Sequence, residues 1–206
     1  MDTKRQTGLL LVLGTIVSMV GWIAFYPADP TDAAAVWASK LIADSDMAVV
    51  GMVLGFGGTT ALLIGLFNIA RRITMGNGAG SSYANVSTIL ILATITLMVV
   101  VAGFEFTVAG AESLGTVAPV VSIAYAMNST MPLVLGLAVI ALGVGIALEK
   151  TYQIKNLPIV ALLGVISGVI LVASVIAENT DWQGIGWPVL MLTTLALGVL
   201  RLRASD

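Results

Sequence analysis

The sequence predicts an all-α, polytopic integral membrane protein, a six-helix transmembrane bundle with one or two short outer-face helices. Three observations lead to this fold class: 58% of the 206 residues are hydrophobic, only 10% are charged, and the apolar residues gather in six long runs. Soluble domains carry about 25% charged residues. We therefore expect a bilayer to cover the apolar surface. The even spread of the runs indicates a single transmembrane domain over residues 1–206.

Each apolar run is long enough for a transmembrane helix, which needs about 20 predominantly apolar residues. The first run follows "MDTKRQ" and could be mistaken for a signal peptide. It is followed by "FYPADP" rather than by a small-residue cleavage site, so we interpret it as a retained span. We expect spans over residues about 8–26, 47–70, 87–109, 131–149, 157–177 and 185–202.

Prolines and capping residues indicate where helices begin. Asn156 before Pro158 and Thr130 before Pro132 are typical of an N-cap with proline in the first turn. Pro188 is expected in the first turn of the sixth span. No proline is then placed in the middle of a span, and we expect no proline kinks.

Two connections on the outer side are too long for simple turns. Over residues 32–43, apolar side chains recur at helical spacing opposite polar ones, which predicts a short amphipathic helix on the outer surface. The segment over residues 112–128 is apolar but contains Gly115 and Pro119. It is expected to form either a lid helix or a re-entrant piece.

The distribution of Lys and Arg predicts the orientation, because cytoplasmic loops carry an excess of both. Eight of the nine basic residues lie on one side of the predicted spans, and only Lys40 lies on the other. Both termini are therefore expected in the cytoplasm. The cytoplasmic anchors include Arg71, Arg72, Lys150, Lys155, Arg201 and Arg203.

The absence of certain residue types limits the chemistry. The chain has no His and no Cys, which removes the common ligands of metals, haem and iron–sulfur clusters, and also thiol nucleophiles. We expect no metal and no cofactor. A net charge of −2 without a basic run disfavours nucleic acid as a partner. No paired carboxylates and no Ser–Lys pair lie at membrane depth, which disfavours an enzyme but leaves open one that acts on a lipid-soluble substrate.

Glu105 is the charged residue closest to the interior of a span. It lies 17 residues after Thr88, which is about 26 Å along a hydrocarbon core about 30 Å thick. We favour a carboxylate at the outer boundary that reaches headgroups or water. The alternative is a proton- or cation-binding group in an outward-facing vestibule, where Glu112 would share its helix face.

Small and hydroxylated residues recur within the spans. Glycines at small-xxx-small spacing are expected to pack helices within one protomer or, alternatively, between protomers, and they are Gly51, Gly55, Gly58, Gly65, Gly164 and Gly168. Threonines at mid-membrane depth could line a polar path, although their hydroxyls usually bond a carbonyl one turn back. They include Thr59, Thr60, Thr94, Thr193 and Thr194.

Three functional hypotheses remain open from the sequence. The first is a non-enzymatic accessory or assembly subunit, or a homo-oligomer, surrounded by membrane lipids and with a functional outer face. The second is a small transporter or channel for a proton, cation or small solute, with Glu105 and Glu112 at its outer mouth. The third is a binder of a lipid-soluble ligand. A water-filled cavity at the midplane would favour the second, and a large apolar pocket would favour the third.

Overall fold

The described part of the chain is a bundle of long helices. The computed structural model describes residues 3–29, 32–154 and 157–203, and no β-strand forms within these ranges. Six helices are long and apolar enough to cross a membrane, so the predicted all-α polytopic fold is confirmed. The elements are α1 (Thr3–Val20), the π-helical turn η1 (Gly21–Phe25), α2 (Ala34–Ala43), α3 (Ser45–Met75), α4 (Ser81–Ala109), α5 (Leu114–Leu148), α6 (Ile159–Ile176) and α7 (Thr180–Arg203).

The six long helices form a closed ring. Packing follows chain order from α3 to α4, α5, α6 and α7, while α1 packs on both α3 and α7 and so closes the ring. Large apolar side chains, such as Val53, Val99 and Leu162, are more than half exposed on its outside, as expected of a surface that faces lipid.

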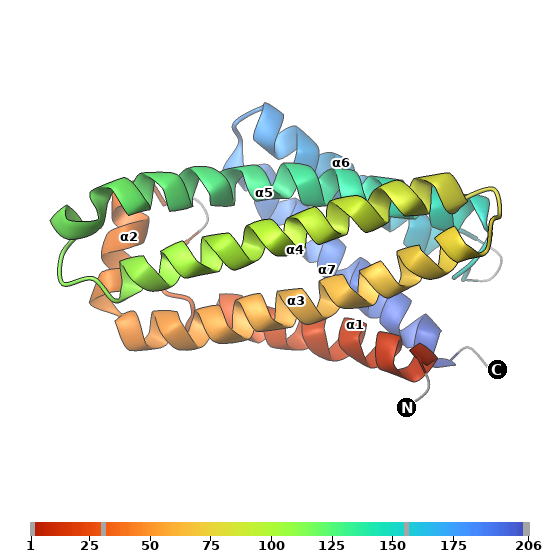
Figure 1. Cartoon of the computed structure of the whole chain (residues 1–206), viewed down its shortest axis with the longest axis horizontal. Helices are drawn as coiled ribbons and strands as arrows, with labels where there is room; N and C mark the ends of the chain where they lie inside the picture. The colour runs from red at the N-terminus through yellow and green to blue at the C-terminus, as the bar shows by residue number, and fades with distance from the viewer. Residues whose placement is uncertain (1–2, 30–31, 155–156, 204–206) are drawn as a thin grey trace.

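The two ends of the bundle differ. The short helix α2 lies across one end, where it packs on α3, α4 and α5 (Figure 1). We call this the α2 end. At the opposite end α1 begins, α3 carries Arg71 and Arg72 near its end, and α7 carries Arg201 and Arg203 in its last turn, so we call it the basic end (Figure 1).

Glycines bring α1 and α3 into backbone contact. A Cβ added at Gly14 would lie 2.6 Å from the backbone nitrogen of Leu62, and one at Gly51 would lie 2.8 Å from that of Tyr26. Real Cβ atoms do not approach backbone this closely, so only glycine fits at these positions. Close approach of this kind drives pairing where lipid supplies no hydrophobic force between helices.

The helix α1 changes geometry where it reaches the α2 end. Its last turn is the π-helical turn η1, and the N–H of Tyr26 bonds the carbonyl of Gly21, five residues back. Turns of this kind are often found at functional sites because they shift the side chains that follow. Here the turn precedes Tyr26, whose ring packs edge-on against that of Trp22 with centroids 4.8 Å apart.

The fifth helix corrects two expectations. The segment over residues 112–128 is neither a separate lid nor re-entrant, because α5 runs unbroken from Leu114 to Leu148 with Pro119 and Pro132 inside it. Thr130 is not an N-cap, since its hydroxyl donates to the carbonyl of Ala126 one turn back.

The seventh helix differs from expectation in the same way. It begins at Thr180, so Pro188 lies inside it rather than in its first turn. The helix start expected at Asn156 falls outside the described residues.

Candidate functional site

A cavity of about 410 Å³ lies inside the ring towards the α2 end. This volume falls within the range of small-molecule binding pockets, about 300–1,000 Å³. Its wall is mostly apolar and takes residues from α1, η1, α2, α3, α4, α5 and α7. The ring therefore encloses a ligand-sized space that no single helix predicts.

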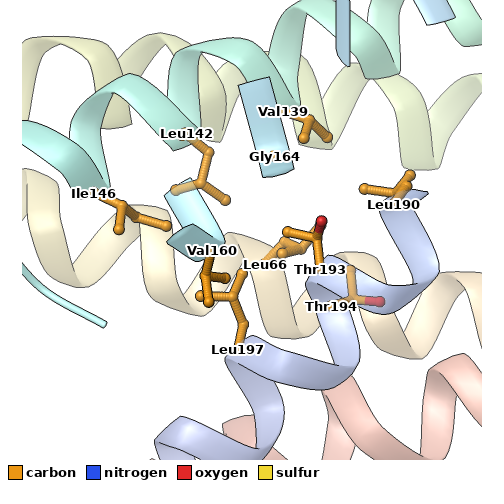
Figure 2. Close-up of a pocket in the computed structure, with 11 residues that line it drawn as sticks. Leu66, Val139, Leu142, Ile146, Val160, Gly164, Leu190, Thr193, Thr194 and Leu197 are labelled. Carbon is orange, nitrogen blue, oxygen red and sulfur yellow. The ribbon is translucent and has the colours of Figure 1, made fainter. Parts of the chain in front are cut away.

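The cavity ends about halfway along the bundle. Its deepest residues are Thr59, Met98 and Met191, which lie near the middle of α3, α4 and α7. Beyond them, side chains from α3, α5, α6 and α7 converge on a void of only about 10 Å³, room for roughly one water molecule (Figure 2). The residues around this void leave too little space for the cavity to continue between them.

The cavity opens where α1 and α7 separate. Towards the basic end these antiparallel helices are joined by a 2.8 Å hydrogen bond between the hydroxyls of Thr15 and Thr194. Further along, Ile23 of η1 and Trp187 of α7 both line the cavity, and Ile23 is 75% exposed. This part of the rim is therefore apolar and exposed.

Aromatic rings form much of the wall. Trp22 packs edge-on against Phe56 with centroids 4.9 Å apart, and Trp37 packs against Tyr125 at 6.3 Å. Edge-to-face pairs hold their rings in fixed orientations. The aromatic lining is Trp22, Tyr26, Trp37, Phe56, Tyr125 and Trp187.

Glu105 lies directly behind this wall. Its side chain is only 1% exposed, and its Oε2 accepts a 2.8 Å hydrogen bond from the hydroxyl of Tyr26. The same Tyr26 oxygen accepts a 2.9 Å bond from the indole N–H of Trp37. The relay from Trp37 through Tyr26 to Glu105 joins α2, the residue after η1, and α4.

The burial of Glu105 overturns the expectation that it reaches headgroups or water. Its level along the helix is as expected, four residues before α4 ends at Ala109. Depth along one helix could not reveal that α2 packs on α4 and that Tyr26 reaches Glu105. Sequence reasoning missed Tyr26 as a partner of Glu105. The available indication was the pair of aromatic residues in the outer connection, with Tyr26 at its start and Trp37 within it.

Glu112 is not part of the site. It is exposed in the turn between α4 and α5, after the helix that carries Glu105 has ended, and therefore shares no helix face with Glu105. The expected pair of carboxylates does not form.

The threonines do not form a path. Thr59, Thr60, Thr94 and Thr193 each donate to the carbonyl four residues back, and Thr194 donates to the carbonyl of Met191. Only Thr59 lines the large cavity, while Thr193 and Thr194 lie at the small void (Figure 2).

The glycines of α3 lie against α1 and η1. Added Cβ atoms would meet Tyr26 at Gly51, Trp22 at Gly55, Ser18 at Gly58 and Leu11 at Gly65. On α6, Gly168 lies against the backbone of Gly136 in α5, whereas Gly164 has only ordinary van der Waals neighbours and borders the small void.

The basic residues gather at the end opposite the cavity. Arg71 and Arg72 lie in the last turns of α3, Lys150 follows α5, and Arg201 and Arg203 lie in the last turn of α7. Lys155 lies outside the described residues.

Within residues 3–29, 32–154 and 157–203, no group of three or more acidic side chains could hold a metal ion.

No protein-family model, curated protein or solved structure matches the chain.

Proposed function

We propose that this chain binds a lipid-soluble molecule in the cavity at the α2 end and does not convert it chemically. The observation that carries the proposal is the cavity itself, with a volume of about 410 Å³ and a mostly apolar, aromatic wall. Pockets that bind small molecules combine such walls with a few polar groups that fix the orientation of the ligand. Here the polar groups gather around Tyr26 and Asn128, while the deep part is closed by Met98 and Met191.

The entrance supports a ligand that arrives through the bilayer. Ile23 and Met19 of the first span are both exposed apolar residues at the cavity rim. A water-soluble substrate would gain nothing from such a rim, because it would have to leave water to pass it. A molecule dissolved in lipid could enter between α1 and α7 without crossing water.

The orientation belongs to the same proposal. The basic end carries Arg71, Arg72, Arg201 and Arg203, and we place it in the cytoplasm together with both termini. The cavity then opens in the outer half of the membrane, and α2 covers the outer end of the bundle.

Transport is the second candidate function. The observation in its favour is the enclosed carboxylate of Glu105, one hydrogen bond from the cavity wall, since buried ionisable groups in membrane helices often serve ion or proton movement. Against it stands the packed interior beyond Thr59, which would have to open for passage. Probe uptake into proteoliposomes that reaches equilibrium only when the protein is present would favour transport over binding alone.

The direct test is to identify what the cavity holds. The protein would be purified in mild detergent, and bound small molecules would be extracted and identified by mass spectrometry. Gly184 lines the cavity, and an added Cβ there meets nothing within 4 Å, so Gly184→Phe should fill the space without a backbone clash. Gly103 is equally open but does not line the cavity, which makes Gly103→Phe the matched control.

The expected result is a small molecule that accompanies the wild-type protein and Gly103→Phe but is depleted from Gly184→Phe. Equal amounts in all three proteins would mean that the molecule is annular lipid and would contradict the proposal. The same preparation tests the proposal of an accessory subunit or homo-oligomer, because a partner protein or a second copy would co-purify.

A further inference from the structure

The hydroxyl donors in the cavity wall are already used within the protein. The hydroxyl of Tyr26 donates to Glu105, and the hydroxyl of Tyr125 donates to the backbone carbonyl of Asp32 at 3.1 Å. Thr59 donates to the carbonyl of Gly55. Each of these side chains has one O–H, so none of the three has a donor left for a ligand.

Two of the three indole donors and the serine hydroxyl are used in the same way. The N–H of Trp37 bonds the hydroxyl oxygen of Tyr26, and the N–H of Trp22 points to the hydroxyl oxygen of Thr59 at 3.4 Å. The hydroxyl of Ser129 at the rim donates to the carbonyl of Tyr125 at 2.8 Å.

Acceptors remain on the same wall. A tyrosine oxygen has two lone pairs, and that of Tyr26 uses only one of them, for Trp37. Proline has no N–H to give to the carbonyl four residues back. Pro132 and Pro188 therefore leave the carbonyls of Asn128 and Gly184 without their usual helical donor, and all four residues line the cavity.

The charges near the cavity have one sign. Asp29 is the only charged side chain among the described lining residues, and Glu105 lies directly behind Tyr26. The nearest basic side chain on α2, Lys40, is held by Asp32, with its Nζ 2.7 Å from Oδ2. No Lys or Arg among the described residues lines the cavity.

We infer that the cavity selects a hydrophobic cation, namely an ammonium group carried on an apolar body. Aromatic faces attract a cation through the electron density of their rings, most strongly when water is excluded. The remaining acceptor oxygens carry partial negative charge, which attracts the cation, and Glu105 behind the wall adds to this attraction in its carboxylate form. This inference rests on the proposed function and narrows it to one ligand class.

The charges of the wall disfavour an anionic ligand. A carboxylate would meet Asp29 and no Lys or Arg among the described lining residues. A wholly apolar molecule would fit the volume but would leave the acceptors unused. An ammonium group on an apolar body satisfies both parts of the wall.

Three probes of matched shape test the inference in the full chain. Benzyltrimethylammonium, its neutral isostere neopentylbenzene and the anion phenylmethanesulfonate share a benzyl body and differ in the charge of the attached group. Three of the four tryptophans line the cavity, so intrinsic fluorescence would report binding. Titrations would use protein in nanodiscs, with empty nanodiscs correcting for partition into lipid and Gly184→Phe as the filled-cavity reference.

The cation should bind about tenfold more tightly than its neutral isostere, and the anion should not bind. Neopentylbenzene binding as tightly as the cation, or the anion binding best, would overturn the inference and leave the proposed function standing. If no probe binds more strongly to the wild type than to Gly184→Phe, the proposed function fails and this inference fails with it.

A charge-neutral variant tests the part played by Glu105. Glu105→Gln keeps the shape and an acceptor oxygen for Tyr26, and it should weaken the cation about tenfold while leaving the neutral isostere unchanged. Glu112→Gln removes an exposed carboxylate outside the cavity and serves as the matched control. A folded Glu105→Gln protein with full cation preference would contradict the electrostatic role of Glu105. The wild-type probe series decides the inference if that variant does not fold.

Discussion

The hydroxyl oxygen of Tyr26 lies 2.8 Å from Oε2 of Glu105, although the two residues are 79 positions apart in the chain. This hydrogen bond ties the end of the first span to the fourth helix, and the bond from Trp37 to the same tyrosine oxygen adds α2. The relay holds three elements together at the end of the bundle where the cavity opens. It also explains how a carboxyl group is accommodated inside an apolar structure, because its Oε2 is hydrogen-bonded.

Tyr26→Phe should destabilise the protein. Removing the hydroxyl takes the donor from buried Glu105 and the acceptor from Trp37, and a buried polar group left unpaired costs about 1–3 kcal/mol. The melting temperature in detergent should fall accordingly. Tyr83→Phe removes a hydroxyl from a tyrosine that is 48% exposed and should change little. Equal melting temperatures for the two variants would mean that the relay does not contribute to stability.

Gly58→Ala should be far more damaging than Gly57→Ala, its neighbour in α3. A Cβ at Gly58 would collide with the backbone of Ser18 in α1, whereas one at Gly57 meets nothing within 4 Å. Overpacking of this kind costs about 1–3 kcal/mol. Thermal unfolding of the two variants in detergent measures the difference, and a Gly58→Ala protein as stable as Gly57→Ala would show that α1 and α3 do not pack by backbone contact.

A similar pair on α6 separates two glycines that sequence spacing treats alike. Gly168→Ala should destabilise by about 1–3 kcal/mol because its Cβ would press on the backbone carbonyl of Gly136. Gly164→Ala should be neutral or stabilising, since its nearest neighbours lie 3.7 Å away or more and it borders the small void. Loss of stability in both variants would contradict the packing around the void.

The ion pair of Asp32 and Lys40 should make stability depend on pH in acid. The Asp32 carboxylate accepts a hydrogen bond from Lys40 and one from the backbone N–H of Asp29. These bonds hold the pKa of Asp32 below its ordinary value of 3.8. A lowered folded-state pKa stabilises the folded state above 3.8, and this contribution is lost as the pH falls through the lower folded-state value.

The measurement is the difference in melting temperature between the wild type and Asp32→Asn as a function of pH. The difference should be constant near neutral pH and shrink towards zero in acid below about 3.8. A difference that grows on acidification has the wrong sign for this pair.

Introduced cysteines should report the orientation, because the chain has none of its own. In intact cells an impermeant thiol reagent should label Ser39→Cys on α2 but not Ser81→Cys at the start of α4. Permeabilised cells should allow both to react. Labelling of Ser81→Cys alone in intact cells would reverse the proposed topology.

The sequence predicts the spans because hydrophobic length is a property of each segment alone. The first span, expected over residues 8–26, is found as Lys4–Phe25, and the outer helix expected over 32–43 is Ala34–Ala43. The prediction is wrong in α5, where Pro132 lies inside the helix rather than in its first turn. Transmembrane helices tolerate internal proline when neighbouring groups satisfy or shield the freed carbonyl.

The site could not be predicted in the same way because it is a property of the ring. Glu105 looks like an edge residue on α4 alone, and its burial depends on other elements, among them α2, which packs on α4, and Tyr26, which bonds its carboxyl group. The cavity likewise depends on the separation of α1 from α7, which no segment encodes by its own composition.

The closure of the ring by α1 and α7 has a consequence for biogenesis. The wall formed by α1 and η1 is synthesised before α2, while the facing wall belongs to α7, the last of the described helices. The site therefore comes into being only after every intervening helix has entered the membrane and α7 has met α1. A molecule that binds there stabilises the finished protein and no partly inserted precursor, since binding shifts an equilibrium only towards the state that binds. Ligand supply could in this way set how much of the newly made chain survives quality control.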